Sequence, residues 1–306
     1  MKFIIVCGPT CTGKTSLGIK LANRYNGEIV NADSRQIYKY TTIGTAKPSE
    51  AELTQAKHHL FDFLELSEVF SAYQYAELAR EVMLKLEREG KLPIVVGGTG
   101  LYLKALTEGI FKAPEPDEAY RESLEEIASK FGTEKLREML ALVDPESAEQ
   151  IKPRDKIRLI RALEVHHQTG STITELKNTG EYLPSLGEPL WLGLNYNRGE
   201  LYEKINLRVD KMIEYGFEQE VKSLEHYLEL LRKRKMIGYS DMIAYMFDNQ
   251  ITRAEAIAKV KQHHRNYAKR QLTWFKKVEK INWFNPSSID YNEAIIKLTD
   301  KYLKSA

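Results

Sequence analysis

Near residue 10 the chain places glycine, lysine and threonine at the spacing of a phosphate-binding loop, G-x-x-x-x-G-K-[ST]. The loop comprises Gly8, Pro9, Thr10, Cys11, Thr12, Gly13, Lys14 and Thr15. Gly8 and Gly13 can adopt backbone angles that other residues avoid, so that successive N–H groups turn toward one anion. Lys14 adds a positive charge, and the Thr15 hydroxyl can bind Mg²⁺. The loop therefore predicts a bound phosphate group, without identifying the compound that carries it.

A carboxylate follows the next apolar segment along the chain. Asp33 comes just after the apolar residues 28–30. A carboxylate at this position could hold a Mg²⁺-bound water or accept a proton from a nucleophile. It could also cap a following helix, where Asp is favoured. Both interpretations stay open at this point.

The third apolar segment ends without an acidic residue. Residues 93–96 are followed by Gly97, Gly98 and Thr99 rather than by the Asp that holds Mg²⁺ in motor-type ATPases. The two glycines permit a close backbone approach, and Thr99 can cap a helix or contact a ligand. This pattern disfavours an ATPase and favours a small-molecule kinase or another use of bound phosphates.

Apolar stretches that alternate with helical patterns must position these residues. Strands are expected at 3–7, 28–30, 93–96, 190–194 and 281–284, and helices at 16–24, 72–89, 201–215 and about 252–278. Such alternation predicts an α/β protein with a mostly parallel sheet flanked by helices. Ligands of such sheets bind at the carboxyl ends of the strands, which is where the polar residues above lie.

Turn-rich stretches at 113–117 and 182–189 divide the chain. The residues between them are charged and helical in pattern, with no strand signal. We therefore expect a core made of residues 1–112 and 190–306, and an all-helical insertion domain at 113–189.

Composition indicates a soluble globular protein, with 42% hydrophobic and 29% charged residues. No run approaches the roughly 18 apolar residues of a membrane helix, and the apolar run at 3–7 is too short for a signal peptide. Cys7 and Cys11 are the two cysteines and form no disulfide framework. We expect a cytoplasmic protein without membrane contact.

Charge is distributed unevenly along the chain. Residues 232–280 contain 13 lysines and arginines but only 4 aspartates and glutamates. This excess predicts a nucleic-acid or polyphosphate partner, with a solvated helix face as the alternative. Aromatic residues Tyr267, Trp274 and Phe275 are interleaved with the basic ones, and packing is the favoured interpretation of their role.

Seven segments, in order, resemble those of bacterial tRNA dimethylallyltransferases, also called tRNA isopentenyltransferases. They are GPT at 8–10, DSRQIY at 33–38, IGTAKP at 43–48, GGTGLY at 97–102, DKIRLIRALE at 155–164, IGY at 237–239 and KRQLTW at 269–274. The resemblance implies a P-loop NTPase-like core with an insertion that contacts the tRNA anticodon stem-loop. It also implies transfer of a dimethylallyl group from dimethylallyl diphosphate to N6 of the adenine 3′-adjacent to the anticodon.

The resemblance also implies roles for individual residues. The phosphate loop would hold the departing diphosphate together with Arg208, and Thr15 would bind Mg²⁺, directly or through water with Asp33. Asp33 would accept the proton of the N6 amine, and Thr99 would position the base. The residues implied to contact tRNA are Asp33, Ser34, Arg35, Gln36, Thr99, Arg121, Arg158, Arg161, Gly238, Tyr239, Lys269, Arg270, Gln271 and Trp274.

Three other functions remain open from the sequence. A transferase acting on free adenine nucleotides would explain the loop, although the basic segment argues against it because a mononucleotide offers few phosphates. A small-molecule kinase would use the loop for ATP, and a nucleotide-gated RNA-binding switch would form no product. The histidine pairs lack chelating spacing, so no further metal site is expected. A monomer suffices for the chemistry.

Overall fold

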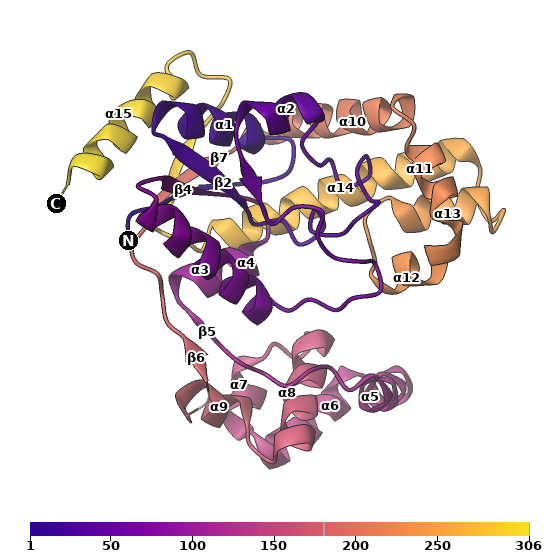
Figure 1. Cartoon of the computed structure of the whole chain (residues 1–306). Helices are drawn as coiled ribbons and strands as arrows, with labels where there is room; N and C mark the ends of the chain where they lie inside the picture. Colours follow the sequence, from indigo (N-terminus) through magenta and orange to yellow (C-terminus); the bar gives the residue numbers. More distant parts are fainter. Residues whose placement is uncertain (180, 306) are drawn as a thin grey trace. The chain divides into compact units, whose positions relative to one another are not determined.

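A single parallel sheet forms the centre of the larger part of the chain (Figure 1). The computed structural model describes residues 1–179 and 181–305. The strands of this sheet are β1 (Ile4–Cys7), β2 (Gly27–Asn31), β3 (His58–His59), β4 (Leu92–Val96), β7 (Leu190–Leu194) and β8 (Asn282–Phe284). Their order is β3-β2-β4-β1-β7-β8, and every neighbouring pair is parallel. The predicted mostly parallel α/β sheet is confirmed.

The register of the strands brings the ends of three of them to one edge. Val6 of β1 lies opposite Val96 of β4, and Asn31 of β2 lies opposite the same Val96. Consequently the phosphate loop after β1, the segment after β2 and the glycines after β4 leave the sheet side by side. The short edge strand β3, by contrast, was not predicted, because two residues are too few to show a period.

Helices cover both faces of the sheet. Those of this part of the chain are α1 (Lys14–Arg24), α2 (Glu50–Gln55), α3 (Ala72–Arg88), α4 (Gly100–Thr107), α10 (Arg198–Glu214), α11 (Phe217–Ser223), the 3₁₀ helix η1 (Glu225–Tyr227), α12 (Leu228–Lys233), α13 (Tyr239–Met246), α14 (Arg253–Phe275) and α15 (Tyr291–Lys304). Leu17 of α1 and Ile295 of α15 are buried with Ile4 and Val6 on one face. Figure 1 shows α3 and α4 on the other.

The long helix α14 begins as its sequence predicts. The Thr252 side chain accepts a hydrogen bond from the Glu255 N–H, and the Glu255 carboxylate accepts one from the Thr252 N–H. This reciprocal capping box satisfies two backbone donors that a helix start leaves unpaired. The helix packs against α10 and α13, and Phe275 near its end is fully buried.

Residues 108–184 form a second compact unit. Its helices are α5 (Glu118–Phe131), α6 (Thr133–Val143), α7 (Pro145–Gln150), α8 (Lys156–Thr169) and α9 (Ile173–Thr179). Leu124, Leu136, Leu140 and Leu159 form its buried centre.

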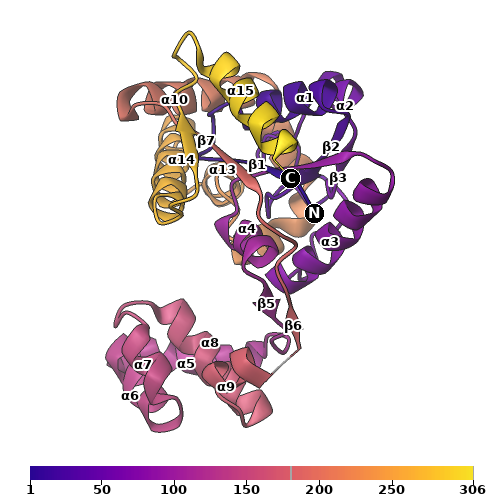
Figure 2. The same ribbon diagram turned by 90° about the vertical axis from the view of Figure 1, so that its left-hand side faces the viewer.

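The boundaries of this unit differ by five residues from the expected 113 and 189. The unit starts and ends on an antiparallel pair of strands, β5 (Ile110–Phe111) and β6 (Tyr182–Leu183), which Figure 2 shows side by side. The sequence shows no signal for strands of two residues. The other unit comprises residues 1–107 and 185–305. Among the described residues, no helix is long and apolar enough to cross a membrane.

A buried carboxylate on β2 bonds to side chains from β3 and from the residue just before β4. Glu28 of β2 is 6% exposed. Its oxygens accept hydrogen bonds from Lys91 at 2.5 Å and from His59 of β3 at 2.6 Å, and Lys57 lies 3.4 Å away. Burial raises the pKa of Glu28, but the bonds from Lys91, His59 and Lys57 outweigh it and lower that pKa to about 2.

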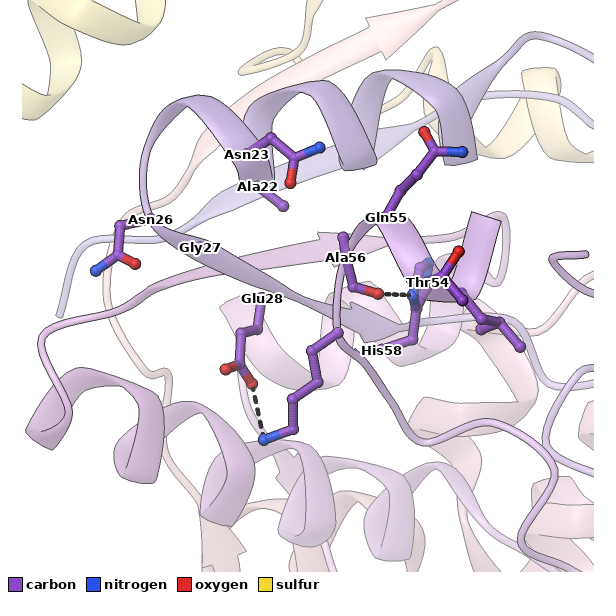
Figure 3. A pocket seen from close by; sticks show the side chains of 11 residues that line it. Ala22, Asn23, Asn26, Gly27, Glu28, Thr54, Gln55, Ala56 and His58 are labelled. Carbon is purple, nitrogen blue, oxygen red and sulfur yellow. Dashed lines mark hydrogen bonds and ion pairs between the residues drawn. The ribbon is translucent and has the colours of Figure 1, made fainter. Parts of the chain in front are cut away.

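Figure 3 shows Glu28 beside an open recess of about 680 Å³, with Asn23 and Asn26 at one end and Gln55 and His58 at the other. No residue of the phosphate loop lines this recess. We therefore infer that Glu28 stabilises the fold and takes no part in catalysis.

We expect Glu28→Gln to lower the free energy of unfolding at pH 7 by about 1–3 kcal/mol, because Lys91 and His59 lose their charged acceptor. A carboxyl whose pKa falls on folding stabilises the protein above its unfolded pKa of about 4.3, and this contribution is lost as the pH falls toward 2. The difference between wild type and variant should therefore shrink between pH 5 and pH 2. Urea denaturation across this range measures it.

Glu65→Gln is the control, because Glu65 pairs with Lys39 at 2.5 Å on the surface. Exposed pairs contribute little to stability, so this variant should unfold like the wild type. A Glu28→Gln variant with unchanged stability at pH 7 would contradict the role assigned to Glu28.

Candidate active site

The phosphate loop has the backbone conformation that its sequence predicts. Gly8 and Gly13 have φ angles of 132° and 85°. A side chain at Gly8 would also lie 2.2 Å from the Leu194 carbonyl oxygen, so only glycine fits there. Cys11 also takes a positive φ, 66°, which is unusual for a residue with a side chain and was not predicted. The Thr12 hydroxyl donates to the Pro9 carbonyl at 2.9 Å and closes the loop.

The lysine of the loop is partly withdrawn from solvent. Its Nζ donates to the Pro9 carbonyl at 2.7 Å. Burial lowers the pKa of Lys14 to about 8, and the nearby Arg208 acts in the same direction. Asp33 and Cys11 act in the opposite direction. Any anion that binds beside Lys14 would stabilise its charged form.

A cleft of about 240 Å³ brings residues of the phosphate loop together with Asp33 and Arg208. The loop from Thr10 to Thr15 lines it, as do Asp33, Gln36, Thr45 and Arg208. A smaller cavity of about 40 Å³ shares Thr10, Asp33, Thr45 and Arg208 with the cleft. This cavity adds further lining residues: Arg35, Gly44, Met236, Ile237, Tyr239, His264 and Tyr267. The carboxylate of Asp33 and the guanidinium of Arg208 therefore lie where the two spaces meet.

Asp33 sits in a turn and not at the start of a helix. Its Oδ1 accepts a hydrogen bond from the Arg35 N–H at 2.9 Å, and its own N–H donates to the Asn31 side chain at 3.0 Å. The residues after Asp33 form turns. The helix-cap interpretation is therefore wrong, because the carboxylate caps a tight turn and faces the cleft instead.

Thr99 holds the segment that carries Asp33. Its hydroxyl oxygen accepts a hydrogen bond from the Ser34 N–H at 2.9 Å, and its own N–H donates to the Ala32 carbonyl at 3.1 Å. A side chain at Gly97 would lie 2.1 Å from that carbonyl oxygen, so the close approach requires glycine. Thr99 lines neither the cleft nor the small cavity, so in the structure its contacts position Ser34.

Gln271 bridges the two glycine-containing loops. Its Oε1 accepts from the Thr10 N–H at 2.9 Å, and its Nε2 donates to the Gly98 carbonyl at 3.0 Å. The side chain is 5% exposed. A contact between Gln271 and tRNA remains a prediction. The scaffold role shown by the structure was not predicted.

Glu220 of α11 holds residues that line the smaller cavity, a role that the sequence did not reveal. Its carboxylate accepts hydrogen bonds from the N–H groups of Thr42, Ile43 and Gly44, at 2.8, 2.6 and 2.9 Å. It also accepts one from the Tyr239 hydroxyl at 2.6 Å. Successive N–H groups of this kind form a concave anion site, which Glu220 fills from within the protein. In sequence Glu220 looks like any acidic residue on a helix surface.

Several residues that the resemblance assigns to tRNA are buried or hydrogen-bonded within the protein. Tyr239 is fully buried and its hydroxyl donates to Glu220, and Gly238 before it is buried as well. Gln36 donates to the Thr45 and Ala46 carbonyls at 3.1 and 2.8 Å. Ser34 and Arg35 are half-buried.

Other residues that the resemblance assigns to tRNA differ in exposure. Lys269 and Arg270 are exposed on α14. Trp274 is half-buried against Gly100, where a Cβ would lie 2.2 Å from the indole, so packing is its role here.

Within residues 108–184, the Arg158 side chain is 73% exposed. Arg121 and Arg161 are half-buried instead and pair with the fully buried Glu164.

Arg208 of α10 is a cation without a counter-ion. Its Nη2 lies 3.1 Å from Nδ1 of His264, and its Nε is buried without a partner among the described residues. Within residues 1–179 and 181–305, neither Arg208 nor Lys14 forms an ion pair with a carboxylate. Two unpaired cations, a phosphate loop and the carboxylate of Asp33 suit the binding of a polyanion beside a group that accepts a proton.

Comparisons with known proteins cover almost the whole chain. The family model described as IPP transferase matches residues 36–278. The tRNA dimethylallyltransferase 2 of Geotalea uraniireducens (strain Rf4) is 41% identical over 306 residues, which are 99% of this chain and 97% of that protein. The tRNA dimethylallyltransferase of Geobacillus thermodenitrificans (strain NG80-2) is 44% identical over 286 residues, 93% of this chain and 90% of that one.

Solved structures agree with these relatives. The full-length tRNA isopentenylpyrophosphate transferase of Bacillus halodurans matches with a TM-score of 0.67 and 35% identity, over 99% of this chain and 95% of that one. A eukaryotic dimethylallyltransferase described as acting on tRNA matches with a TM-score of 0.80 and 27% identity, over 99% of this chain and 79% of that one.

We expect Gln271→Leu to lower the free energy of unfolding by about 1–3 kcal/mol, because the Thr10 N–H and the Gly98 carbonyl lose their partner. The freed loops should also bind inorganic diphosphate more weakly. Urea denaturation and titration calorimetry measure the two effects. Gln262→Leu, an exposed change on the same helix, is the control, and equal stability of the two variants would contradict the bridge.

Proposed function

The chain belongs to the IPP transferase family, that of the tRNA dimethylallyltransferases, and we propose that its cleft transfers a dimethylallyl group from dimethylallyl diphosphate to tRNA. The acceptor is N6 of the adenine 3′-adjacent to the anticodon. The observation that carries the proposal is the pair of unpaired cations, Lys14 and Arg208, beside the carboxylate of Asp33 in one cleft.

The diphosphate of the donor lies against the phosphate loop. The loop N–H groups, Lys14 and Arg208 all offer positive charge or donors to it, and α1 begins at Lys14 with its N-terminus beside the cleft. Negative charge grows on the diphosphate as its bond to carbon breaks. Groups that are already oriented stabilise that charge without rearranging.

In the proposed reaction, N6 of adenine attacks C1 of the allylic donor, and a nitrogen–carbon bond forms. The carbon–oxygen bond breaks, and the diphosphate leaves with its electron pair. One proton of the amine passes to the Asp33 carboxylate and then to solvent. The amine is weakly basic because its lone pair is delocalised into the ring, so a positioned acceptor raises the rate.

The residues of the cleft fit a Mg²⁺ ion that is held mainly by phosphate oxygens and water. Thr15 and Asp33 line the cleft and supply a hydroxyl and a carboxylate, which are oxygen ligands of the kind Mg²⁺ prefers. Among the described residues, no cluster of three His, Cys, Asp or Glu could hold a metal alone. When bound, Mg²⁺ neutralises charge on the diphosphate.

The tRNA side of the proposal rests on exposed basic residues. Lys269 and Arg270 on α14 and Arg158 in residues 108–184 are open to solvent and can contact phosphates. We assign residues 108–184 to the anticodon stem-loop. The target adenine is stacked in free tRNA and must be extruded before N6 reaches the donor. A cytoplasmic monomer is sufficient for this function.

The main test mixes the protein with labelled dimethylallyl diphosphate, Mg²⁺ and unmodified tRNA whose anticodon is followed by adenines. We expect label on the tRNA and none on an equal concentration of AMP, because a mononucleotide cannot use the basic surface. Label on AMP instead would favour a free-nucleotide transferase, and transfer of the ATP γ-phosphate would favour a kinase. Folded protein that binds tRNA without labelling it would exclude the proposal.

We expect Asp33→Asn to lower the turnover number by about 10²–10⁴-fold and to leave the affinity for tRNA nearly unchanged. The asparagine oxygen can still accept from the Arg35 N–H, so the turn persists while the proton acceptor is lost. Single-turnover labelling and filter binding measure the two quantities. Asp290→Asn is the control, because Asp290 is exposed and its side chain caps no helix N–H group. A comparable loss of tRNA affinity would make Asp33 a binding residue.

A further inference from the structure

His264 of α14 contacts the diphosphate-binding arginine from the neighbouring helix. It is 5% exposed, and its Nδ1 lies 3.1 Å from Nη2 of Arg208 on α10. A guanidinium carries only donors, so Arg208 donates and Nδ1 accepts. The proton of the neutral ring is therefore on Nε2. That nitrogen is buried without a partner among the described residues, so no competing bond holds the ring.

The environment keeps this imidazole neutral. Burial lowers the pKa of His264 to about 3, and the charges of Arg208 and the adjacent His263 act in the same direction. His263 itself pairs with Asp241 at 2.7 Å, and its side chain is half-exposed. His264 consequently accepts a hydrogen bond from Arg208 without adding any charge of its own.

We propose that His264 is a positioning residue that orients the guanidinium of Arg208 through a neutral acceptor and so leaves its full positive charge for the diphosphate. The inference rests on the proposed function, in which Arg208 binds the leaving group. Arg208 lines both the phosphate cleft and the smaller cavity, whereas His264 lines the cavity alone. The imidazole thus contacts the arginine on the side of the smaller cavity.

The choice of a neutral partner has an electrostatic consequence. A carboxylate in the same place would hold Arg208 at least as firmly, because charge-assisted hydrogen bonds are about twice as strong as neutral ones. It would also cancel most of the charge that the diphosphate needs, in surroundings where charges interact strongly. An apolar side chain would leave the charge of Arg208 unchanged but would not orient its guanidinium. The imidazole supplies orientation and preserves charge together.

Three variants separate these effects. His264→Asn places a neutral acceptor near the position of Nδ1, His264→Asp places a charged acceptor of the same shape, and His264→Leu removes the acceptor. The probe is inorganic diphosphate with MgCl₂, titrated by calorimetry, because its binding does not depend on turnover. His226→Asp is the control, since the His226 side chain is 87% exposed and makes no contact with Arg208.

We expect His264→Asn to bind diphosphate within about 3-fold of wild type, and His264→Asp to bind it about 10-fold more weakly or worse, since one interaction of about 1.4 kcal/mol corresponds to tenfold. His264→Leu should lie between them, and His226→Asp should match wild type. In turnover, His264→Asp should raise the KM for the allylic donor while the KM for tRNA stays unchanged. A purely structural role would affect the isosteric Asn and Asp variants alike.

The experiment distinguishes a failure of the cleft assignment from a failure of the role of His264. Wild-type protein that binds no diphosphate would overturn the assignment of the cleft, whatever the variants do. Wild-type protein that binds diphosphate, with His264→Asp binding equally well, would overturn the role of His264. If His264→Asp does not fold by circular dichroism, the comparison of His264→Leu with His264→Asn decides, and equal affinities would contradict the inference.

Discussion

The structure of the cleft depends on two cations, Lys14 and Arg208, that form no ion pair with a carboxylate among the described residues. Lys14 and Arg208 are withdrawn from water, which costs free energy that a carboxylate partner would usually offset. Their partners are instead the Pro9 carbonyl and the neutral ring of His264. Such partners orient the cations and leave their charge uncompensated. Burial lowers the pKa of Lys14, and the charge of Arg208 acts in the same direction, whereas a bound polyanion would raise it.

Cations without a counter-ion keep their positions only if the surrounding loops are held rigidly. Here the support comes from side chains that join loops distant in sequence. Gln271 connects the phosphate loop to Gly98, and Thr99 connects the end of β4 to the turn of Asp33. Glu220 fixes the segment of Gly44 through three backbone N–H groups. Each bond is worth about 1 kcal/mol, but together they hold the reacting groups in one geometry.

Local sequence predicts the parts of this site that depend on local geometry. The phosphate loop, the order of its flanking elements and the capping box of α14 follow from spacing and residue type. The strands β3, β5 and β6 could not be predicted from the sequence, because a strand of two residues shows no alternating pattern. The roles of Gln271, Glu220 and His264 could not be predicted from the sequence for another reason. Each depends on a partner more than 50 residues away in sequence, and no local pattern marks a polar helix residue as buried.

The distribution of charge also bears on which bond the site breaks. Phosphoryl transfer spreads charge over the transferred group and usually relies on metal ligands at the ends of two strands. Here β4 ends at Val96 and is followed by Gly97 and Gly98 rather than by a carboxylate. In alkyl transfer the charge collects on the departing diphosphate alone. The cations Lys14 and Arg208 at the phosphate loop, with the carboxylate of Asp33 beside them, suit this second chemistry.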